Sequence, residues 1–417
     1  MSTVNDIVTA NGNFKTVYAD RQRDLTPDNS YYSAEAQTMT PDKSPGGDYN
    51  LPVVLSCEQG DTKAASSDAA FALNPAEAME IKYASINGNQ YVKRIAFSYN
   101  AITRSKNKNA FVSITKAGVK NGLKAAFNDL EYEIMWGKRG LGTISATGTN
   151  TFTVTLAEFA AGLWRDARGM SVGIETSGGV LKGYCKVVSV NLTTRVVTVD
   201  SLPAGTTSTD VVFKKADGLS GANSMLGIYS MITTSGTVFG ISNSTYSIWK
   251  SAGTFSAGSA PLTFNKIALA LAQAEDNGLG DEIRVIDCVV NTKTFASLGN
   301  NLNELRDIDT NYKTDENVLG QEAISFYAGC GKVRLFSHKY MKEGYAFIHP
   351  KAARSVQIIG SVPKPTFGIP GAKEGEEYLR TMENNAGCET RLYRDSAMFT
   401  EIPNQFLLIN NIVNPTV

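Results

Sequence analysis

Few residues in this sequence could carry out catalysis or hold a metal ion. Its two histidines are His338 and His349, and neither has a Cys or His neighbour at the spacing of a zinc site. The five cysteines are far apart without a CxxC pair, which indicates reduced thiols. Cys330, between two glycines, could be exposed on a loop, although we interpret it as structural. With no GxSxG or cysteine-protease signature, the sequence predicts a protein that is no enzyme and needs no cofactor.

A glycine-rich segment at 137–142, Gly-Lys-Arg-Gly-Leu-Gly, combines glycines with bases as phosphate-binding loops do. It lacks the GxxxxGK[ST] pattern, and it follows a helical segment instead of opening one. We therefore interpret it as a helix stop with a tight connection.

Charge is balanced overall but unevenly distributed. Lys+Arg and Asp+Glu both number 40, whereas a dedicated nucleic-acid binder is usually basic. Residues 1–60 hold more acids than bases, and residues 101–124 hold bases without an acid. The bases that we take as a candidate contact surface are Arg104, Lys116, Lys120 and Lys124. Opposite charges predict that the polar, turn-rich arm 1–60 docks there, in the same subunit or a neighbour. The alternative is two solvated surfaces that never meet.

The sequence shows no feature of a membrane or secreted protein. No apolar run approaches the ~20 residues of a membrane span. The first residues lack a basic region followed by an apolar core, so we expect no signal peptide and no membrane partner.

Residues 78–99 alternate between apolar and polar positions, as half-buried strands do. Asn87 and Gly88 lie between the two halves, and Asn-Gly is the strongest two-residue hairpin signal because both residues tolerate positive φ. The pattern predicts a hairpin turning at these residues. Because an isolated hairpin is only marginally stable, its apolar face needs another surface. Asn87, Gly88, Tyr91 and Lys93 are therefore candidate contacts with a neighbouring copy.

A long amphipathic helix is predicted for residues 110–136. Its apolar stripe consists of Val119, Leu123, Ala126, Phe127, Leu130 and Ile134. At 1.5 Å per residue it would span roughly 40 Å, longer than an average globular helix. The lysines at 116, 120 and 124 form a row of like charge with i, i+4 spacing, which is mildly destabilising alone. An acidic surface or phosphates would relieve the repulsion, and a solvated face is the alternative.

The remaining sequence predicts an all-β segment followed by mixed elements. Residues 142–215 contain short β-branched strands with Gly, Asn and Thr turns, which favours a small barrel or sandwich. Thr263 and Asn291 are positioned to cap helices, the first ending at Asn277-Gly278. Further strands are expected at 284–290, 332–336, 345–348, 391–399 and 405–409. The predicted class is α+β with an all-β insertion.

From about residue 75 onward, the order of segments resembles tailed-phage major capsid proteins of the Hong Kong 97 type. The segments that carry the resemblance are 111–142, 227–229 with 240–249, 289–298, and 391–412. The resemblance implies an N-terminal arm, an extended β-hairpin loop, a peripheral domain with a long spine helix, an axial domain and an inserted small all-β domain.

The resemblance also implies a domain layout. The expected ranges are 1–60 for the N-terminal arm, 61–105 for the extended loop, 106–141 for the spine helix, 142–215 for the inserted β domain, 216–254 for a return to the peripheral domain, 255–360 for the axial domain, and 361–417 for the closing strands of the peripheral domain.

By the same resemblance, the chain would form hexamers and pentamers of an icosahedral head in the host cytoplasm and become part of the virion. Expected partners are a portal protein, a separate scaffolding protein, possible decoration proteins, and enclosed double-stranded DNA held by weak non-specific contact. Two alternatives remain: an encapsulin-like compartment around an enzyme, and a phage or bacterial surface β protein or hydrolase.

Overall fold

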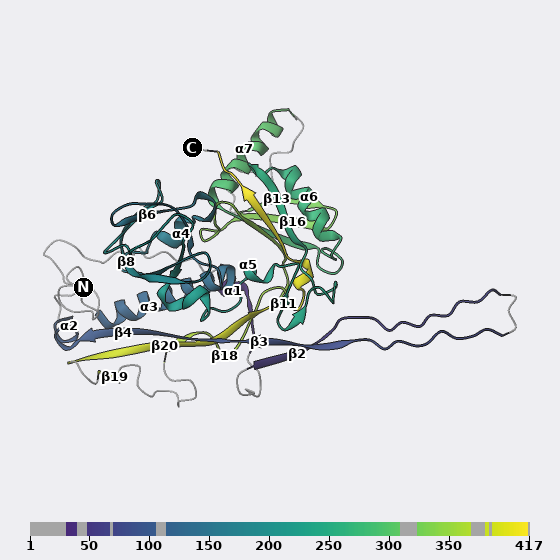
Figure 1. The fold of residues 1–417 in the computed structure, drawn as a ribbon, viewed down its shortest axis with the longest axis horizontal. Coiled ribbons are helices and arrows are strands. Elements are labelled where there is room, and N and C mark those ends of the chain that lie inside the picture. The colour runs from purple at the N-terminus through teal and green to yellow at the C-terminus, as the bar shows by residue number, and fades with distance from the viewer. Residues whose placement is uncertain are drawn as a thin grey trace. The chain divides into compact units, whose positions relative to one another are not determined.

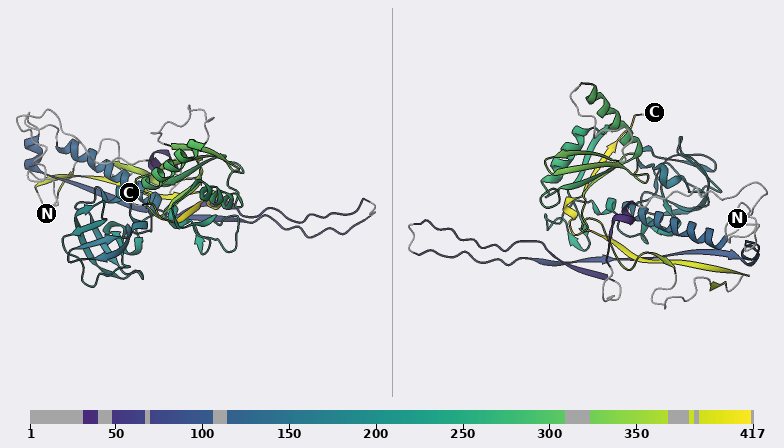
Figure 2. Two further views of the ribbon diagram at one scale, coloured as in Figure 1. Left: turned by 90° about the horizontal axis from the view of Figure 1, so that it is seen from above. Right: turned by 180° about the vertical axis from the view of Figure 1, so that it is seen from behind.

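The computed structural model describes residues 31–39, 48–66, 70–105, 114–308, 323–367, 380–382 and 386–415. The chain divides into two compact units, each assembled from three separate stretches. The first unit comprises 1–43, 88–228 and 356–398, and the second comprises 44–87, 229–355 and 399–417. Figures 1 and 2 show their elements.

A long strand pair and a long helix frame the first unit. β4 (Asn89–Ser98) runs antiparallel to β20 (Gly387–Phe399), and α3 (Ile114–Trp136) packs against β4. β20 also pairs with β18 (Gln357–Phe367) and β19 (Arg380–Thr381), and β1 (Gln37–Met39) joins β18 in parallel. The residues buried between helix and sheet are Ile95, Phe97, Ala101, Ala126 and Leu392. The helix predicted from the apolar stripe is thus present at 114–136, while residues 110–113 lie outside the described part.

Two glycines allow α3 to approach β4 closely. A Cβ on Gly118 would lie 2.5 Å from Phe97 Cε1, and one on Gly122 would lie 2.1 Å from Ile95 Cδ1. Both distances are shorter than the contacts that Cβ atoms make in proteins. A side chain at either glycine would therefore force Phe97 or Ile95, or the helix itself, to move. Glycine disfavours a helix interior by about 1 kcal/mol relative to alanine, and close packing offsets that loss here.

Part of the predicted N-terminal arm is folded onto the first unit. α1 (Tyr31–Glu35) packs on α3, where the buried Glu131 carboxylate accepts hydrogen bonds of 2.7 Å from the backbone nitrogens of Tyr32 and Ser33. We expected residues 1–60 to form an N-terminal arm that needs a partner surface to order, and residues 31–35 of it form a helix on α3. Composition did not reveal this helix because the carboxylate that it contacts is distant in sequence. Residues 1–30 and 40–47 lie outside the described residues.

Six strands of the first unit close into a barrel in the order β10-β5-β6-β9-β8-β7. They are β5 (Gly142–Thr147), β6 (Thr151–Val154), β7 (Ser171–Glu175), β8 (Leu181–Asn191), β9 (Val196–Val199) and β10 (Val211–Lys214). All neighbours are antiparallel, and β-branched side chains fill the interior. The short α4 (Ala161–Trp164) adds Trp164, which contacts Phe152 edge-on at a centroid distance of 6.2 Å.

The glycine-rich segment after α3 is a helix stop, as predicted. α3 ends at Trp136, and Lys138 adopts a positive φ of 62°. A Cβ on Gly137 would lie 2.2 Å from the Met225 carbonyl oxygen, so only a residue without a side chain lets these two backbone segments lie this close together. α2 (Tyr99–Ser105) precedes α3 in the chain.

A mixed six-stranded sheet with two helices forms the body of the second unit. The strand order is β13-β21-β17-β14-β16-β15. The strands are β13 (Gly253–Ala260), β14 (Val285–Val290), β15 (Ala323–Ala328), β16 (Gly331–Ser337), β17 (Ala346–Pro350) and β21 (Leu407–Ile412). The helices α6 (Phe264–Glu275) and α7 (Thr292–Ile308) contribute Ile267, Leu271 and Leu298 to its core.

Both helix caps predicted in this region are confirmed. The Thr263 hydroxyl accepts from the Lys266 backbone nitrogen at 3.4 Å, and Asn291 Oδ1 accepts from that of Lys293 at 2.9 Å. The predicted strands at 284–290, 332–336 and 345–348 correspond to β14, β16 and β17.

The two strands expected at 391–399 and 405–409 are present and lie in different sheets. β20 belongs to the sheet of the first unit, and β21 lies between β13 and β17 in the second. Leu407, Leu408 and Ile409 are all buried, as a central strand requires.

The hairpin predicted at Asn87-Gly88 is absent. β3 (Ile81–Asn87) pairs with β2 (Asp48–Val54), whereas β4 pairs with β20. Neither Asn87 nor Gly88 adopts the positive φ of a type I′ turn. The alternating pattern over 78–99 belongs to two strands with different partners, one in each unit.

Candidate functional site

A two-stranded arm in the second unit is the first candidate assembly element. β2 and β3 continue as an extended pair over residues 55–66 and 70–80, which runs away from the rest of this unit in Figures 1 and 2. Few hydrogen bonds hold the distal part, among them the paired backbone bonds of 2.9 Å between Gln59 and Glu77. The extended two-stranded element of this unit is therefore this arm and not a hairpin at Asn87-Gly88.

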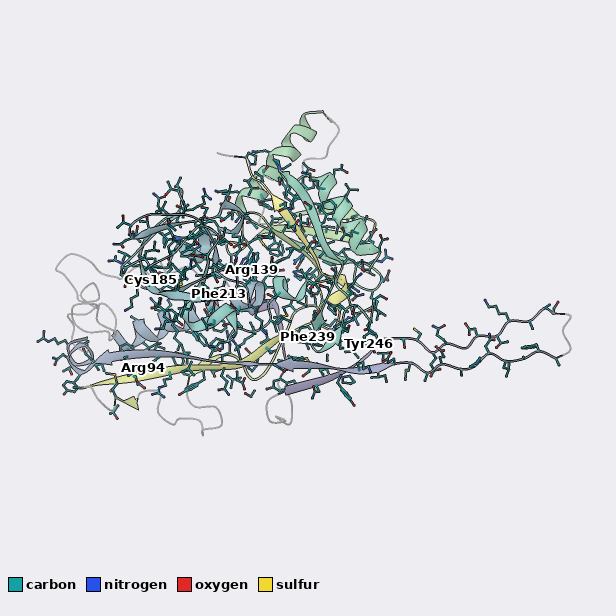
Figure 3. The ribbon with its side chains drawn as sticks, in the orientation of Figure 1. Arg94, Arg139, Cys185, Phe213, Phe239 and Tyr246 are labelled. Carbon is teal, nitrogen blue, oxygen red and sulfur yellow. The ribbon has the colours of Figure 1, made fainter. Side chains whose placement is uncertain are left out.

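The base of the arm is anchored within the second unit. The Ser85 backbone nitrogen donates to the Phe239 carbonyl oxygen at 2.8 Å, and the Tyr246 hydroxyl donates to the Glu80 carboxylate. Phe239 and Tyr246 lie at this base in Figure 3. Lys82 also pairs with Glu80 at 3.1 Å, and the hydrogen bonds of Tyr246 and Lys82 lower the pKa of this carboxyl. The base of the arm is therefore held by contacts with the rest of the second unit, whereas few hydrogen bonds hold its distal part.

The distal arm exposes apolar and acidic side chains together. Its exposed apolar residues are Phe71, Leu73 and Met79, with Leu73 78% exposed, and Val54, Ile81 and Tyr83 are exposed in the strands β2 and β3 at the base. The charged residues between 55 and 80 that the structure describes are Glu58, Asp61, Lys63, Glu77 and Glu80. An isolated two-stranded ribbon is marginally stable in water, so this surface requires a partner.

The sheet face of β4 and β20 that points away from α3 is the second candidate. Val92 lies opposite Tyr393, and Arg94 lies opposite Arg391. Both guanidinium groups bind one carboxylate, Glu389, which is buried beneath them. Burial would raise the pKa of Glu389, but Arg391 and Arg94 lower it. Figure 3 shows Arg94 on this strand pair.

A cluster of buried charges lies on the inner side of the same strands. Lys214 Nζ contacts Asp129 Oδ1 at 2.6 Å, and Arg394 Nη2 contacts Glu133 Oε2 at 2.7 Å. Asn89 Nδ2 donates to the same Glu133 oxygen at 2.9 Å. Burial would raise the pKa of Asp129, but the charges of Lys214 and Arg394 lower it, whereas burial raises the pKa of Glu133.

Asp217 borders this cluster at the end of the barrel. It is 5% exposed, and burial raises its pKa to about 7 although the Lys214 charge acts in the opposite direction. The cluster thereby links α3, β4, β20 and the barrel strand β10 through charge. These residues connect the elements of the first unit through ion pairs and hydrogen bonds.

The predicted contact residues are dispersed. Tyr91 and Lys93 are half-buried on the inner side of β4, where the Arg394 guanidinium lies 4.9 Å from the Tyr91 ring centre. Burial lowers the pKa of Lys93, with Asp129 opposing. Asn87 and Gly88 are exposed at the strand junction. Their contacts with another copy stay predictions.

The predicted basic residues share the helical region of the first unit. Lys116 and Lys120 are exposed on α3, Lys124 is half-buried, and Arg104 is exposed on α2. The sequence interpretation missed the exposed Arg94, the half-buried Arg391 opposite it and the acidic arm. Their charges can be read from the sequence, but the residues that they face cannot.

The described residues contain no group of three or more metal-binding side chains. Both histidines are buried, and His349 stacks on Phe406 at 5.4 Å. Cys330 is buried instead of exposed, and burial raises the pKa of its thiol to about 12. This thiol is therefore a poor nucleophile. Among the described helices, none combines the length and apolar character needed to span a bilayer.

Comparison with known proteins gives structural likeness only. No family model and no curated protein matches the sequence. The cyanophage A-1(L) capsid protein is similar with a TM-score of 0.57 at 10% identity, over 98% of this chain and 99% of that one. The cyanophage Pam1 capsid protein scores 0.48 at 10% identity, over 99% and 100%. An encapsulin from Synechococcus elongatus scores 0.45 at 7% identity, over 100% and 99%. The cyanophage A-1(L) likeness, which spans both chains, shows that this chain has the Hong Kong 97-type fold of tailed-phage capsid proteins.

Proposed function

We propose that this chain is the major capsid protein of a tailed double-stranded DNA phage. Copies assemble into hexamers and pentamers that close an icosahedral head around the genome. The observation that carries the proposal is the β2–β3 arm, whose apolar side chains are exposed in the described part of the chain. A subunit with such an arm completes its surface by contacting other copies. The capsid fold over nearly the whole chain supports this role.

The elements fit the expected domains with changed boundaries. α3 is the spine helix of the peripheral domain, and the arm from β2 to β3 is the extended loop. The closed barrel between Gly142 and Lys214 is the inserted β domain. The sheet with α6 and α7 is the axial domain, directed to the centre of each capsomer.

The partners follow from this role. A portal protein occupies one vertex, a separate scaffolding protein guides assembly in the host cytoplasm, and decoration proteins bind the outside of the virion. The enclosed DNA makes weak, non-specific contacts. Zero net charge suits a wall that does not hold its DNA tightly.

Sedimentation velocity of the purified protein, alone and with the scaffolding protein, tests the proposal. We expect a discrete fast-moving species that nuclease treatment leaves intact, because protein contacts hold the shell. A monomer in both samples would contradict a shell-forming role. Shells that enclose a specific enzyme instead of DNA in infected cells would support the encapsulin-like alternative.

A further inference from the structure

We propose that the barrel is docked on α3 by ion pairs that exchange partners, and that the Asp217 carboxyl controls the exchange. When Asp217 holds its proton, Lys214 of the barrel binds Asp129 of α3, which is the pairing in the structure. When Asp217 ionises, Lys214 turns to it and leaves Asp129. Asp129 then binds Arg394, and the barrel is released from the helix. The inference concerns a single subunit and does not depend on the proposed function.

The contact between the barrel and α3 depends on charge more than on packing. Among the described elements, those that pack most extensively on α3 are α1, α2, β4 and β18, and none of these is a barrel strand. Lys214 is the last residue of the barrel strand β10. Its Nζ lies 2.6 Å from Asp129 Oδ1 and 3.8 Å from the centre of the Tyr132 ring. Both partners belong to α3, so movement of this one side chain removes an ion pair and a cation–π contact together.

Lys214 has a second acid at its own end of the barrel. Asp217 is the last residue of the 3-10 turn Lys215–Asp217, and side chains three residues apart lie on the same side of such a turn. Burial would lower the pKa of Lys214, but the carboxylates of Asp129 and Asp217 raise it. Lys214 therefore lies between an acid of the helix and an acid of the barrel. A proton on Asp217 decides which of the two is the stronger partner.

Arg394 offers Asp129 a new partner. Its side chain is fully buried, and its Nη2 binds Glu133 Oε2 at 2.7 Å, whereas its Nε and Nη1 have no hydrogen-bond partner among the described residues. Buried donors without an acceptor cost free energy, so an acceptor that reaches these nitrogens is stabilising. Asp129 and Glu133 are one turn apart on the same side of α3. Burial would raise the pKa of Asp129, but the charges of Lys214 and Arg394 lower it, so the guanidinium is already close.

The groups around Asp217 determine when its proton leaves. The titratable and charged side chains near it are Lys214 on β10, Asp129, Tyr132 and Glu133 on α3, and Glu175 on β7, which packs on the same turn, while Lys93 on β4 and Arg394 on β20 lie near Asp129. Burial raises the pKa of Asp217 to about 7, although the Lys214 charge acts in the opposite direction. The side chains of Lys214 and Asp129 are 17% and 18% exposed, so water reaches the network and takes up the proton. The docked arrangement is therefore the one at lower pH.

The distance between the barrel and α3 reports the exchange. Nitroxide labels are attached to Thr194→Cys in the β8–β9 turn and Asn121→Cys on α3, both exposed positions, in a Cys57→Ser and Cys388→Ser background. Pulsed electron paramagnetic resonance of unassembled subunits gives their separation at pH values from about 5.5 to about 8.5. We expect one narrow distance distribution at the lowest pH. A second, broader population should become the larger one at the highest pH, with a midpoint at about pH 7.

Three variants test which carboxylates control the exchange. Asp217→Asn cannot ionise and should keep the narrow distribution throughout the pH range. Asp129→Asn removes the acid on the helix and should show the broad population already at the lowest pH. Asp200→Asn is the matched control, because Asp200 is a barrel acid outside this network that accepts from two backbone nitrogens at 2.8 Å. It should keep the wild-type midpoint.

Arg394→Lys tests the second half of the exchange. Lysine keeps a positive charge for Glu133 but lacks the additional nitrogens of the guanidinium, so Asp129 gains no new partner when Lys214 leaves. The midpoint should therefore move to higher pH, and a wild-type midpoint in this variant would contradict the role of Arg394. An unchanged distance distribution in wild type across the pH range, or a wild-type transition in Asp217→Asn, would overturn the whole inference.

Discussion

Asp217 gives the first unit a specific dependence of stability on pH. Its carboxyl is buried near Lys214, and burial raises its pKa to about 7 from the ordinary 3.8. The folded state holds this proton more tightly than the unfolded chain does. The protonated Asp217 carboxyl therefore contributes fully to the free energy of unfolding at pH values below its pKa in the unfolded chain. This contribution is lost as pH rises through its pKa in the folded state. Stability should therefore fall between about pH 4 and pH 7.

The magnitude follows from the two pKa values. Each unit of difference corresponds to about 1.4 kcal/mol, so the ionised form costs about 4 kcal/mol above pH 8. At pH 5 the cost is smaller, and the change from pH 5 to pH 8 is about 2–3 kcal/mol. Asp217→Asn cannot ionise and should escape this change. Its free energy of unfolding relative to wild type should rise by that amount between the two pH values.

Urea unfolding of unassembled subunits at a series of pH values measures this difference. Trp136 and Trp164 are buried in the first unit and Trp249 in the second, so in a Trp249→Phe background the fluorescence reports unfolding of the first unit. Ser224→Ala removes a hydrogen bond that lowers the pKa of Asp217 but keeps the titrating carboxyl, so this variant should lose stability with rising pH at least as much as wild type. Parallel curves for wild type and Asp217→Asn would refute the assignment of a buried, raised-pKa carboxyl.

Three further perturbations test the packing and the arm. Gly122→Val should cost about 2 kcal/mol or more in thermal unfolding, because its side chain would overlap Ile95, and an unchanged melting temperature would refute the close helix–strand contact. Glu131→Ala leaves two backbone nitrogens of α1 unsatisfied and should lower the free energy of unfolding by about 2–4 kcal/mol. Amide hydrogen exchange at Tyr32 should accelerate in this variant, and Glu131→Gln should lower the free energy of unfolding by less. Deleting residues 56–79 should leave melting of the subunit intact but abolish assembly, and normal shells from this deletion would refute the role of the arm.

Local patterns were sufficient for the helices and for several strands. The apolar stripe around Leu123 and Leu130 predicted α3, and the polar residues Thr263 and Asn291 predicted where α6 and α7 begin. These features depend on side chains within a few residues of each other, and such interactions can be read directly from the sequence.

Partners distant in sequence were not predictable in the same way. Asn87-Gly88 has the composition of a turn. However, the strand before it, β3, pairs with β2 and the strand after it, β4, pairs with β20, so the two strands do not form a hairpin. Glu131 caps a helix that begins about a hundred residues earlier. Lys214 and Asp129 meet only because the barrel closes beside α3. Strand alternation shows which faces are buried, but it does not show which element covers them.

Cryo-electron microscopy of particles purified after expression with the scaffolding protein is the most direct test of the central claim. The account predicts closed icosahedral shells of hexamers and pentamers, with the β2–β3 arm of each subunit in density against a neighbouring copy. Discrete monomers, or open aggregates in which the arm contacts no other subunit, would contradict it.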